Sequence, residues 1–146
     1  MARSVRIVAA IATLGIALFL LSAPVAAEVI MNDRFTFTVT NVNPCAAGDG
    51  PVTLTFEEHD VWQRLADGTL LVHSNFHGTG TSANGVDYVV NRRQITTVVG
   101  GVSTGTFEVV RVSKGSGDNV HIEGTFTFDP NRVPPRIQTT TFRCVG

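Results

Sequence analysis

The segment Val61-Trp-Gln-Arg-Leu-Ala-Asp-Gly-Thr-Leu-Leu-Val72 carries the strongest hairpin signal in the chain. Asp67-Gly68 is one of the dipeptides that favour a two-residue β-turn, and its flanks are rich in residues that suit strands. Such a turn pairs Ala66 with Thr69, and this pair sets the register of both flanking strands. The segment therefore predicts an antiparallel hairpin, and the chain on both sides extends the pattern.

Short segments in which apolar and polar residues alternate recur outside this hairpin, and no segment has a convincing helical period. Turn residues separate them at intervals of roughly 10 to 16 residues. We expect an all-β fold of about seven or eight strands, closed into an antiparallel up-and-down β-barrel that leaves no exposed edges. A β-sandwich is the alternative. The clearest alternating segments are Phe35–Val39, Val52–Phe56, Thr106–Val112, Val120–Phe128 and Ile137–Cys144.

Residues 1–27 have the order of a secretory signal peptide. Arg3 and Arg6 precede an apolar run over residues 7–21, and small residues follow up to Ala27. The run spans about 15 residues, fewer than the roughly 20 that a membrane-spanning helix needs. We expect cleavage after Ala27, a secreted protein and a single domain over residues 28–146. An uncleaved N-terminal anchor is the alternative.

Charge and cysteine content agree with export. Cleavage would remove two of the eleven basic residues and leave twelve acidic ones, with no basic run to attract nucleic acid. Cys45 and Cys144 are the two cysteines of the chain, and a single pair in an oxidising compartment usually forms a disulfide. The sequence therefore predicts a β domain closed by one disulfide, and it leaves the oligomeric state open.

Several short segments resemble a group of small, uncharacterised secreted bacterial proteins. They are Asn43-Pro-Cys45 with Pro51-Val-Thr-Leu-Thr55, His73-Ser-Asn75, His121-Ile-Glu-Gly-Thr-Phe126 and Phe142-Arg-Cys144. The resemblance covers most of the chain after residue 27 and implies a bacterial, exported, disulfide-closed protein, but no activity. In size and strand number the chain is also similar to lipocalin-like and allene-oxide-cyclase-like barrels, which is a likeness of fold alone.

The expected hairpin register gathers polar side chains on one face. It places Trp62 opposite His73, Asp60 opposite Asn75, and Glu58 opposite His77. Carboxylates beside imidazoles raise the pKa of histidine and favour proton transfer. If this face lines the interior, Trp62, His73, Asn75 and His77 form a ligand-binding pocket. If it points outward, it is a solvated, charge-paired surface, and the sequence leaves both readings open.

No assembled catalytic motif accompanies this cluster, so we expect a non-catalytic binding module for a small, partly apolar ligand or a cell-surface partner. The alternative is an enzyme of the isomerase or cyclase kind that uses Asp60, Glu58 and His73 as acid–base groups. A structural envelope protein is a third hypothesis. No metal or other cofactor is expected, because His73 and His77 would lie about 13 Å apart on a strand.

Overall fold

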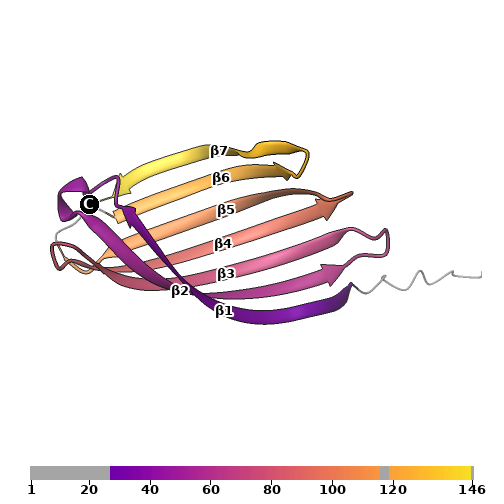
Figure 1. Ribbon diagram of the computed structural model, residues 1–146, viewed down its shortest axis with the longest axis horizontal. Coiled ribbons are helices and arrows are strands. Elements are labelled where there is room, and N and C mark those ends of the chain that lie inside the picture. Colours follow the sequence, from indigo (N-terminus) through magenta and orange to yellow (C-terminus); the bar gives the residue numbers. More distant parts are fainter. Residues whose placement is uncertain (1–26, 116–118, 146) are drawn as a thin grey trace, which may run out of the picture.

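The computed structural model describes residues 27–115 and 119–145, so the predicted signal peptide lies outside the described residues except for Ala27. Seven strands and one short 3-10 helix follow one another in this part of the chain (Figure 1). They are β1 (Glu28–Val42), η1 (Ala47–Asp49), β2 (Pro51–Arg64), β3 (Leu70–Ser82), β4 (Asp87–Val99), β5 (Val102–Ser113), β6 (Asn119–Asp129) and β7 (Arg132–Val145). Among these elements no helix is long and apolar enough to cross a membrane.

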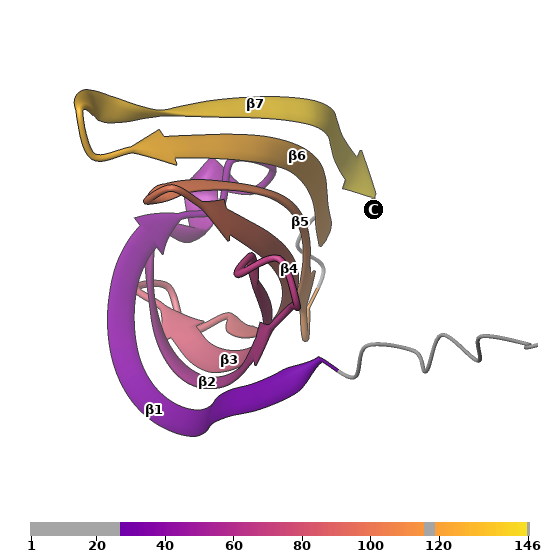
Figure 2. The ribbon, with the colours of Figure 1, turned by 90° about the vertical axis from the view of Figure 1, so that its right-hand side faces the viewer.

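The strands form one antiparallel sheet in the order β1-β2-β3-β4-β5-β6-β7, which confirms the all-β meander. The closed barrel and the two-sheet sandwich are both wrong, because β1 and β7 remain unpaired edges of a single sheet that curls into an open trough (Figure 2). One physical reason lies in β7, where Pro134 and Pro135 have no N–H to donate to a further strand.

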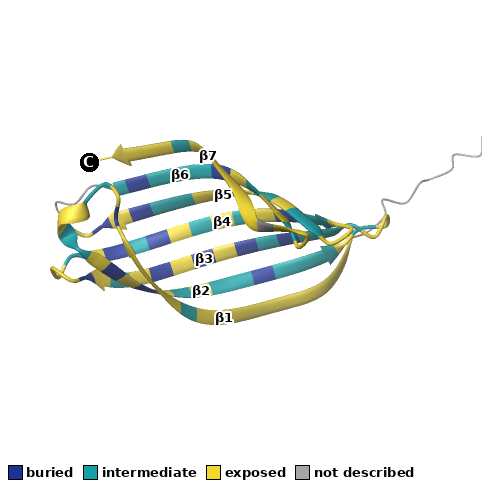
Figure 3. Ribbon diagram, turned by 45° about the horizontal axis from the view of Figure 1, so that its top comes forward, coloured by how far each residue is buried: buried dark blue, intermediate teal, exposed yellow. Residues whose placement is uncertain are grey.

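Burial alternates along the strands and identifies the two faces of the sheet (Figure 3). We call the face that carries the buried side chains the concave face and the opposite one the convex face. The hydrophobic core on the concave face consists of Val52 and Leu54 from β2 and Tyr88 and Val90 from β4. Because these residues lie at the start of β2 and of β4, the core occupies one end of the trough.

Three phenylalanine rings on the concave face each pack over a glycine directly across the strand pair. The pairs are Phe56 with Gly78, Phe107 with Gly124, and Phe126 with Gly105. A Cβ atom at Gly78 or Gly124 would lie 2.5 Å from the facing ring, and one at Gly105 would lie 2.3 Å from the carbonyl oxygen of Ile95. Glycine at these positions leaves room for the rings and lets the strands bend sharply.

A disulfide between Cys45 and Cys144 connects the loop after β1 to the end of β7, with a Cα–Cα distance of 5.5 Å. The predicted pairing of the two cysteines is therefore confirmed. The bond links residues 99 positions apart, so it brings the two edge strands together at the end of the trough that holds the core.

A buried polar network reinforces the same end of the trough. The Asn43 side chain is fully buried, and its Nδ2 donates a hydrogen bond to the Tyr88 hydroxyl over 3.2 Å. That hydroxyl in turn donates to the carboxylate of Asp49 in η1. Arg111 on β5 donates to Oδ1 of Asn41 on β1 over 2.7 Å, so a hydrogen bond also spans the trough from one wall to the other.

Removal of the cross-link should strongly destabilise the fold. We expect the double variant Cys45→Ser/Cys144→Ser to lose up to about 4 to 5 kcal/mol of unfolding free energy, because the unfolded chain regains the entropy of a long loop. Urea unfolding monitored by circular dichroism measures the change. Reduction of the unaltered protein should produce the same loss, and an unchanged midpoint in both experiments would contradict a structural role.

The glycines under the phenylalanine rings should be intolerant of even one added methyl group. We expect Gly105→Ala to cost about 3 kcal/mol, since its Cβ would collide with the backbone of β4 and the Phe126 ring. Thr106→Ala, at the adjacent convex position, should cost less than about 1 kcal/mol. Equal melting temperatures for the two variants would show that the sheet adapts at this position.

Candidate functional site

The hairpin between β2 and β3 has a three-residue loop rather than the expected two-residue turn. Leu65 N–H donates to the Thr69 carbonyl over 2.9 Å, and Gly68 N–H donates to the Leu65 carbonyl over 3.0 Å. Gly68 has a φ of +85°, the left-handed conformation that a three-residue hairpin loop requires. Leu65 therefore faces Thr69, and the predicted register is wrong by one residue.

This shift divides the predicted cluster between the two faces of the sheet, because side chains alternate with a period of two. Trp62 lies opposite Val72, Asp60 opposite Ser74, and Glu58 opposite Phe76. His73, Asn75 and His77 instead lie opposite Val61, His59 and Glu57. The structure thus places Glu58, Asp60 and Trp62 on the concave face and His73, Asn75 and His77 on the convex face, so these six side chains do not form one site.

The concave face nevertheless holds a larger polar cluster beside the hydrophobic core. The members of this concave polar cluster are Glu58, Asp60 and Trp62 on β2, Ser74 on β3, and Arg92, Gln94 and Thr96 on β4. Asp60, Ser74 and Thr96 are buried. Arg92 donates a hydrogen bond to the Gln94 side-chain oxygen, and Gln94 Nε2 donates to Thr96 Oγ1 over 3.1 Å, so β4 contributes a connected row.

Three buried polar atoms of this cluster have no hydrogen-bond partner among the described residues. They are Asp60 Oδ1, Trp62 Nε1 and Arg92 Nε. Asp60 is only 7% exposed. A buried polar group without a partner costs about 1–3 kcal/mol, and such groups are rare in folded proteins. Two donors and one acceptor therefore remain available on the concave face for a molecule that enters the trough.

Electrostatics couple the two carboxyl groups of β2. Burial and the neighbouring Asp60 raise the pKa of Glu58 from its ordinary 4.5 to about 7, against the lowering effect of Arg92. A hydrogen bond with the Asp60 side chain raises the pKa of Glu58 further. Asp33 on β1 faces Asp60 directly and adds a further, exposed carboxyl group.

Arg92 joins the carboxyl groups to the aromatic part of the concave face. Its guanidinium carbon lies 4.9 Å from the centre of the Phe76 ring and 5.7 Å from that of Phe107. Burial lowers the pKa of Arg92, whereas the nearby Glu58 opposes this shift. The cation is therefore held between two rings beside Glu58.

An apolar groove of about 420 Å³ adjoins the cluster on the β4–β7 side of the concave face. Its volume is within the range of about 300–1,000 Å³ that is common for small-molecule sites. Arg92 and Gln94 belong both to this groove and to the concave polar cluster. The other residues that line it are Phe107, Val109, Phe126, Phe128, Pro135 and Ile137.

The convex face has a more polar hollow of about 510 Å³ across β1–β4. Of the predicted ligand contacts, Asn75 and His77 line it, together with His59 and Arg93. Its side chains are largely exposed and hydrogen-bond to one another, as when His77 Nδ1 lies 2.9 Å from Asn91 Oδ1. Because none of the buried unpaired atoms belongs to a residue whose side chain points to this face, the concave face is the stronger candidate site.

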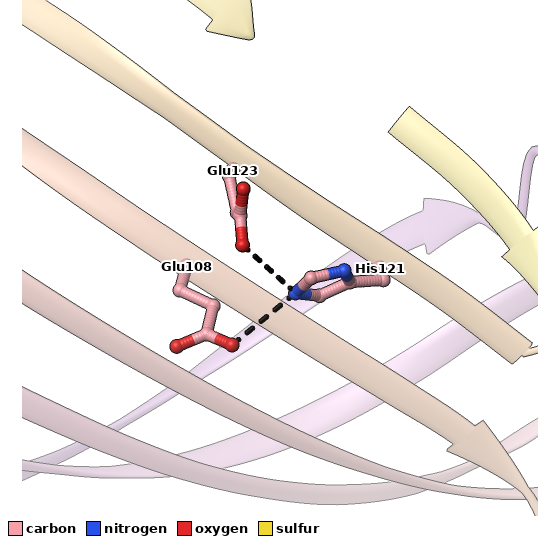
Figure 4. Close-up of side chains that lie close together, drawn as sticks. All are labelled: Glu108, His121 and Glu123. Atoms are coloured by element: carbon pink, nitrogen blue, oxygen red, sulfur yellow. Dashed lines mark hydrogen bonds and ion pairs between the residues drawn. The ribbon is translucent and has the colours of Figure 1, made fainter. Parts of the chain in front are cut away.

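Glu108, His121 and Glu123 form a second cluster on the convex face, where both carboxylates approach one imidazole nitrogen (Figure 4). His121 Nε2 lies 3.2 Å from Glu108 and 3.5 Å from Glu123. Arg143 donates to the other ring nitrogen, Nδ1, over 2.9 Å. A metal ion on Nε2 would place the proton of a neutral ring on Nδ1, where it would oppose the Arg143 donor. This arrangement favours a hydrogen-bond network, in which the neutral ring accepts from Arg143 and donates to a carboxylate, over a metal site.

Comparisons with protein-family models, with curated proteins and with solved structures each find no match to this chain. The likeness to small secreted bacterial proteins remains a prediction from short segments. Function must therefore be inferred from the geometry and chemistry of the concave face.

The contribution of β4 to the site was not predicted from the sequence. Arg92, Gln94 and Thr96 alternate with exposed residues and share their face with Tyr88 and Val90 of the core. The pattern was visible in the sequence. Five alternate residues of β4 point to the same face of the sheet, and the first two of them are the apolar residues of the core. It was overlooked because the polar members resemble the solvated side of an amphipathic strand.

Titration of Glu58 should make the stability of the folded protein depend on pH. Because the folded state binds this proton more tightly than the unfolded state, the contribution of Glu58 to stability falls as pH rises from about 4.5 to about 7. We expect the stability of Glu58→Gln relative to the unaltered protein to increase through this window and to level off above it. Urea midpoints between pH 4.5 and 8 measure the difference. Glu57→Gln, an exposed convex-face control, should show no such increase, and a parallel trend in both variants would contradict the assignment.

Proposed function

We propose that the protein is a secreted, non-catalytic binding module that holds a small, partly apolar ligand on its concave face. The observation that carries this proposal is an apolar groove of suitable volume that includes Arg92, whose Nε is buried and unpaired. The groove adjoins the concave polar cluster, in which Asp60 Oδ1 and Trp62 Nε1 are also buried and unpaired. Ligand sites commonly combine an apolar lining with a few convergent polar groups that orient the ligand. Arg92 and Gln94 connect the two parts, so one molecule can contact both.

Export is part of the proposal and is supported by the cross-link. Disulfides persist in oxidising compartments and are rare in the cytosol. Cys45 and Cys144 form such a bond, and the described residues contain no free cysteine. A module that meets its ligand outside the cell gains from this bond, because the trough keeps its shape without a second layer of structure.

The isomerase or cyclase alternative is less well supported. Its three acid–base groups were Asp60, Glu58 and His73, but His73 lies on the convex face opposite Val61. Glu58 and Asp60 alone remain on the concave face, and a carboxyl group with a pKa of about 7 suits proton transfer near neutral pH. Among the described residues we identify no third group placed to complete an acid–base mechanism, so binding is the function that the geometry favours.

The groove is tested by placing a charge in it without disturbing the core. Ile137 lines the groove and is 69% exposed, so Ile137→Glu should fold normally and yet disfavour an apolar ligand. Ile95 is 47% exposed on the convex face, which makes Ile95→Glu a matched control. The neutral dye N-phenyl-1-naphthylamine should gain fluorescence with the unaltered protein and with Ile95→Glu.

We expect Ile137→Glu to weaken dye binding at least tenfold while its melting temperature remains close to that of the control variant. The measurement is a fluorescence titration of each purified, disulfide-bonded protein. Equal dye affinities for the two glutamate variants would place the binding elsewhere, and the proposed groove would then be abandoned.

A further inference from the structure

We infer that the concave site selects a neutral hydroxyl group, so that its ligand is an apolar alcohol rather than a carboxylate or an amine. This inference rests on the proposed binding function and specifies the polar end of the ligand. It follows from the kinds of atoms left without partners, from the charge balance around them, and from their place in the sheet.

The unpaired atoms demand both hydrogen-bond donation and acceptance. Trp62 Nε1 and Arg92 Nε are donors, whereas Asp60 Oδ1 is an acceptor while the Asp60 carboxylate is ionised. A hydroxyl group donates one hydrogen bond and accepts up to two, so it can serve both kinds of partner. A ligand carboxylate only accepts and an ammonium group only donates, and either would leave one kind of buried atom unsatisfied.

The charges of the concave polar cluster also favour a neutral head group. Burial and Asp60 raise the pKa of Glu58 to about 7, so this carboxyl group is partly protonated near neutral pH, and the Arg92 cation acts against this shift. A carboxylate beside them would face Asp60 and Asp33, and an ammonium group would face Arg92. Each would bring an additional unbalanced charge into a partly buried site, which is costly in a medium of low polarity.

The register connects these atoms with the apolar groove. Trp62 pairs with Val72, Val72 with Thr96, Thr96 with Gly105, and Gly105 with Phe126, so one row crosses the concave face from β2 to β6. Gly105 contributes no side chain to this row, and the Phe126 ring packs over it. An alcohol with its apolar body along Phe126 therefore directs its hydroxyl group toward β2, where Trp62 and Asp60 lie.

Four probes of equal length and different head groups test this inference. They are octan-1-ol, its isomer 1-methoxyheptane, octanoate and octylammonium, each titrated calorimetrically into the purified, disulfide-bonded protein near pH 7.5. We expect octan-1-ol to bind at least tenfold more tightly than the other three. The ether accepts but does not donate, so its deficit reports the hydrogen bond to Asp60.

Two variants test whether the hydroxyl group binds on the concave face. Trp62→Phe keeps an aromatic ring but removes the N–H donor, and it should weaken octan-1-ol about tenfold, the usual effect of one lost hydrogen bond. His73→Gln changes the convex face of the adjacent strand and should leave the affinity unchanged. The melting temperature of each variant shows whether it has folded.

The outcomes separate this inference from the proposed function. If octanoate or octylammonium binds most tightly, or all four probes bind equally, and Ile137→Glu abolishes that binding, the groove is a ligand site and the hydroxyl preference is wrong. An octan-1-ol affinity that is unchanged in Trp62→Phe would also overturn the preference. If no probe binds up to its solubility limit and the dye does not bind either, both the inference and the proposed function fail.

Discussion

The cross-link between Cys45 and Cys144 is the constraint on which the rest of the structure depends. In the described part of the chain the curled sheet has no second layer to cover it, and its hydrophobic core is small, with Val52, Leu54, Tyr88 and Val90 at its centre. Both edge strands would otherwise be free to separate, since no hydrogen bonds pair β1 with β7. The disulfide and the buried Asn43–Tyr88 hydrogen bond hold one end of the trough together, and the curvature there positions the strands that carry the site.

The concave face has a packed apolar end and a polar end, and the polar end contributes to the proposed binding site. One end is apolar and closely packed, whereas the other carries carboxyl groups, an arginine and an indole N–H that are only partly satisfied. A sequence optimised for stability alone would replace Asp60 and Arg92 by apolar residues, because buried charges seldom repay the cost of their desolvation. Departures of this kind are expected where function outweighs stability. The disulfide offsets part of the cost from the opposite end of the trough.

Much of the fold was predictable from the sequence, but the site was predictable only in part. Alternation and turn residues correctly indicated a meander of strands, and the two cysteines indicated their own pairing. The hairpin register failed because Asp67-Gly68 suits both a two-residue turn and the end of a three-residue loop, and only the conformation of Gly68 distinguishes them. The resulting register shift of one residue places the side chains of His73, Asn75 and His77 on the convex face. The apolar residues Val52 and Leu54 were better evidence for the orientation of β2. In a strand without a bulge, alternate side chains share one face, so Glu58, Asp60 and Trp62 point to the concave face together with this apolar pair.

Because the sheet does not close, the groove is open along β7, where the proposed ligand would enter. In a closed barrel β7 would pair with β1, and the side chains of Pro135 and Ile137 would face an enclosed interior. Here β7 is an edge, and Phe128 and Ile137 remain 41% and 69% exposed although they line the groove. The apolar wall is thus accessible from the side, whereas Asp60 lies deep at the opposite wall. A ligand that enters along β7 meets the apolar lining first and the polar groups last, an order that suits a molecule whose small polar end leads a larger apolar body.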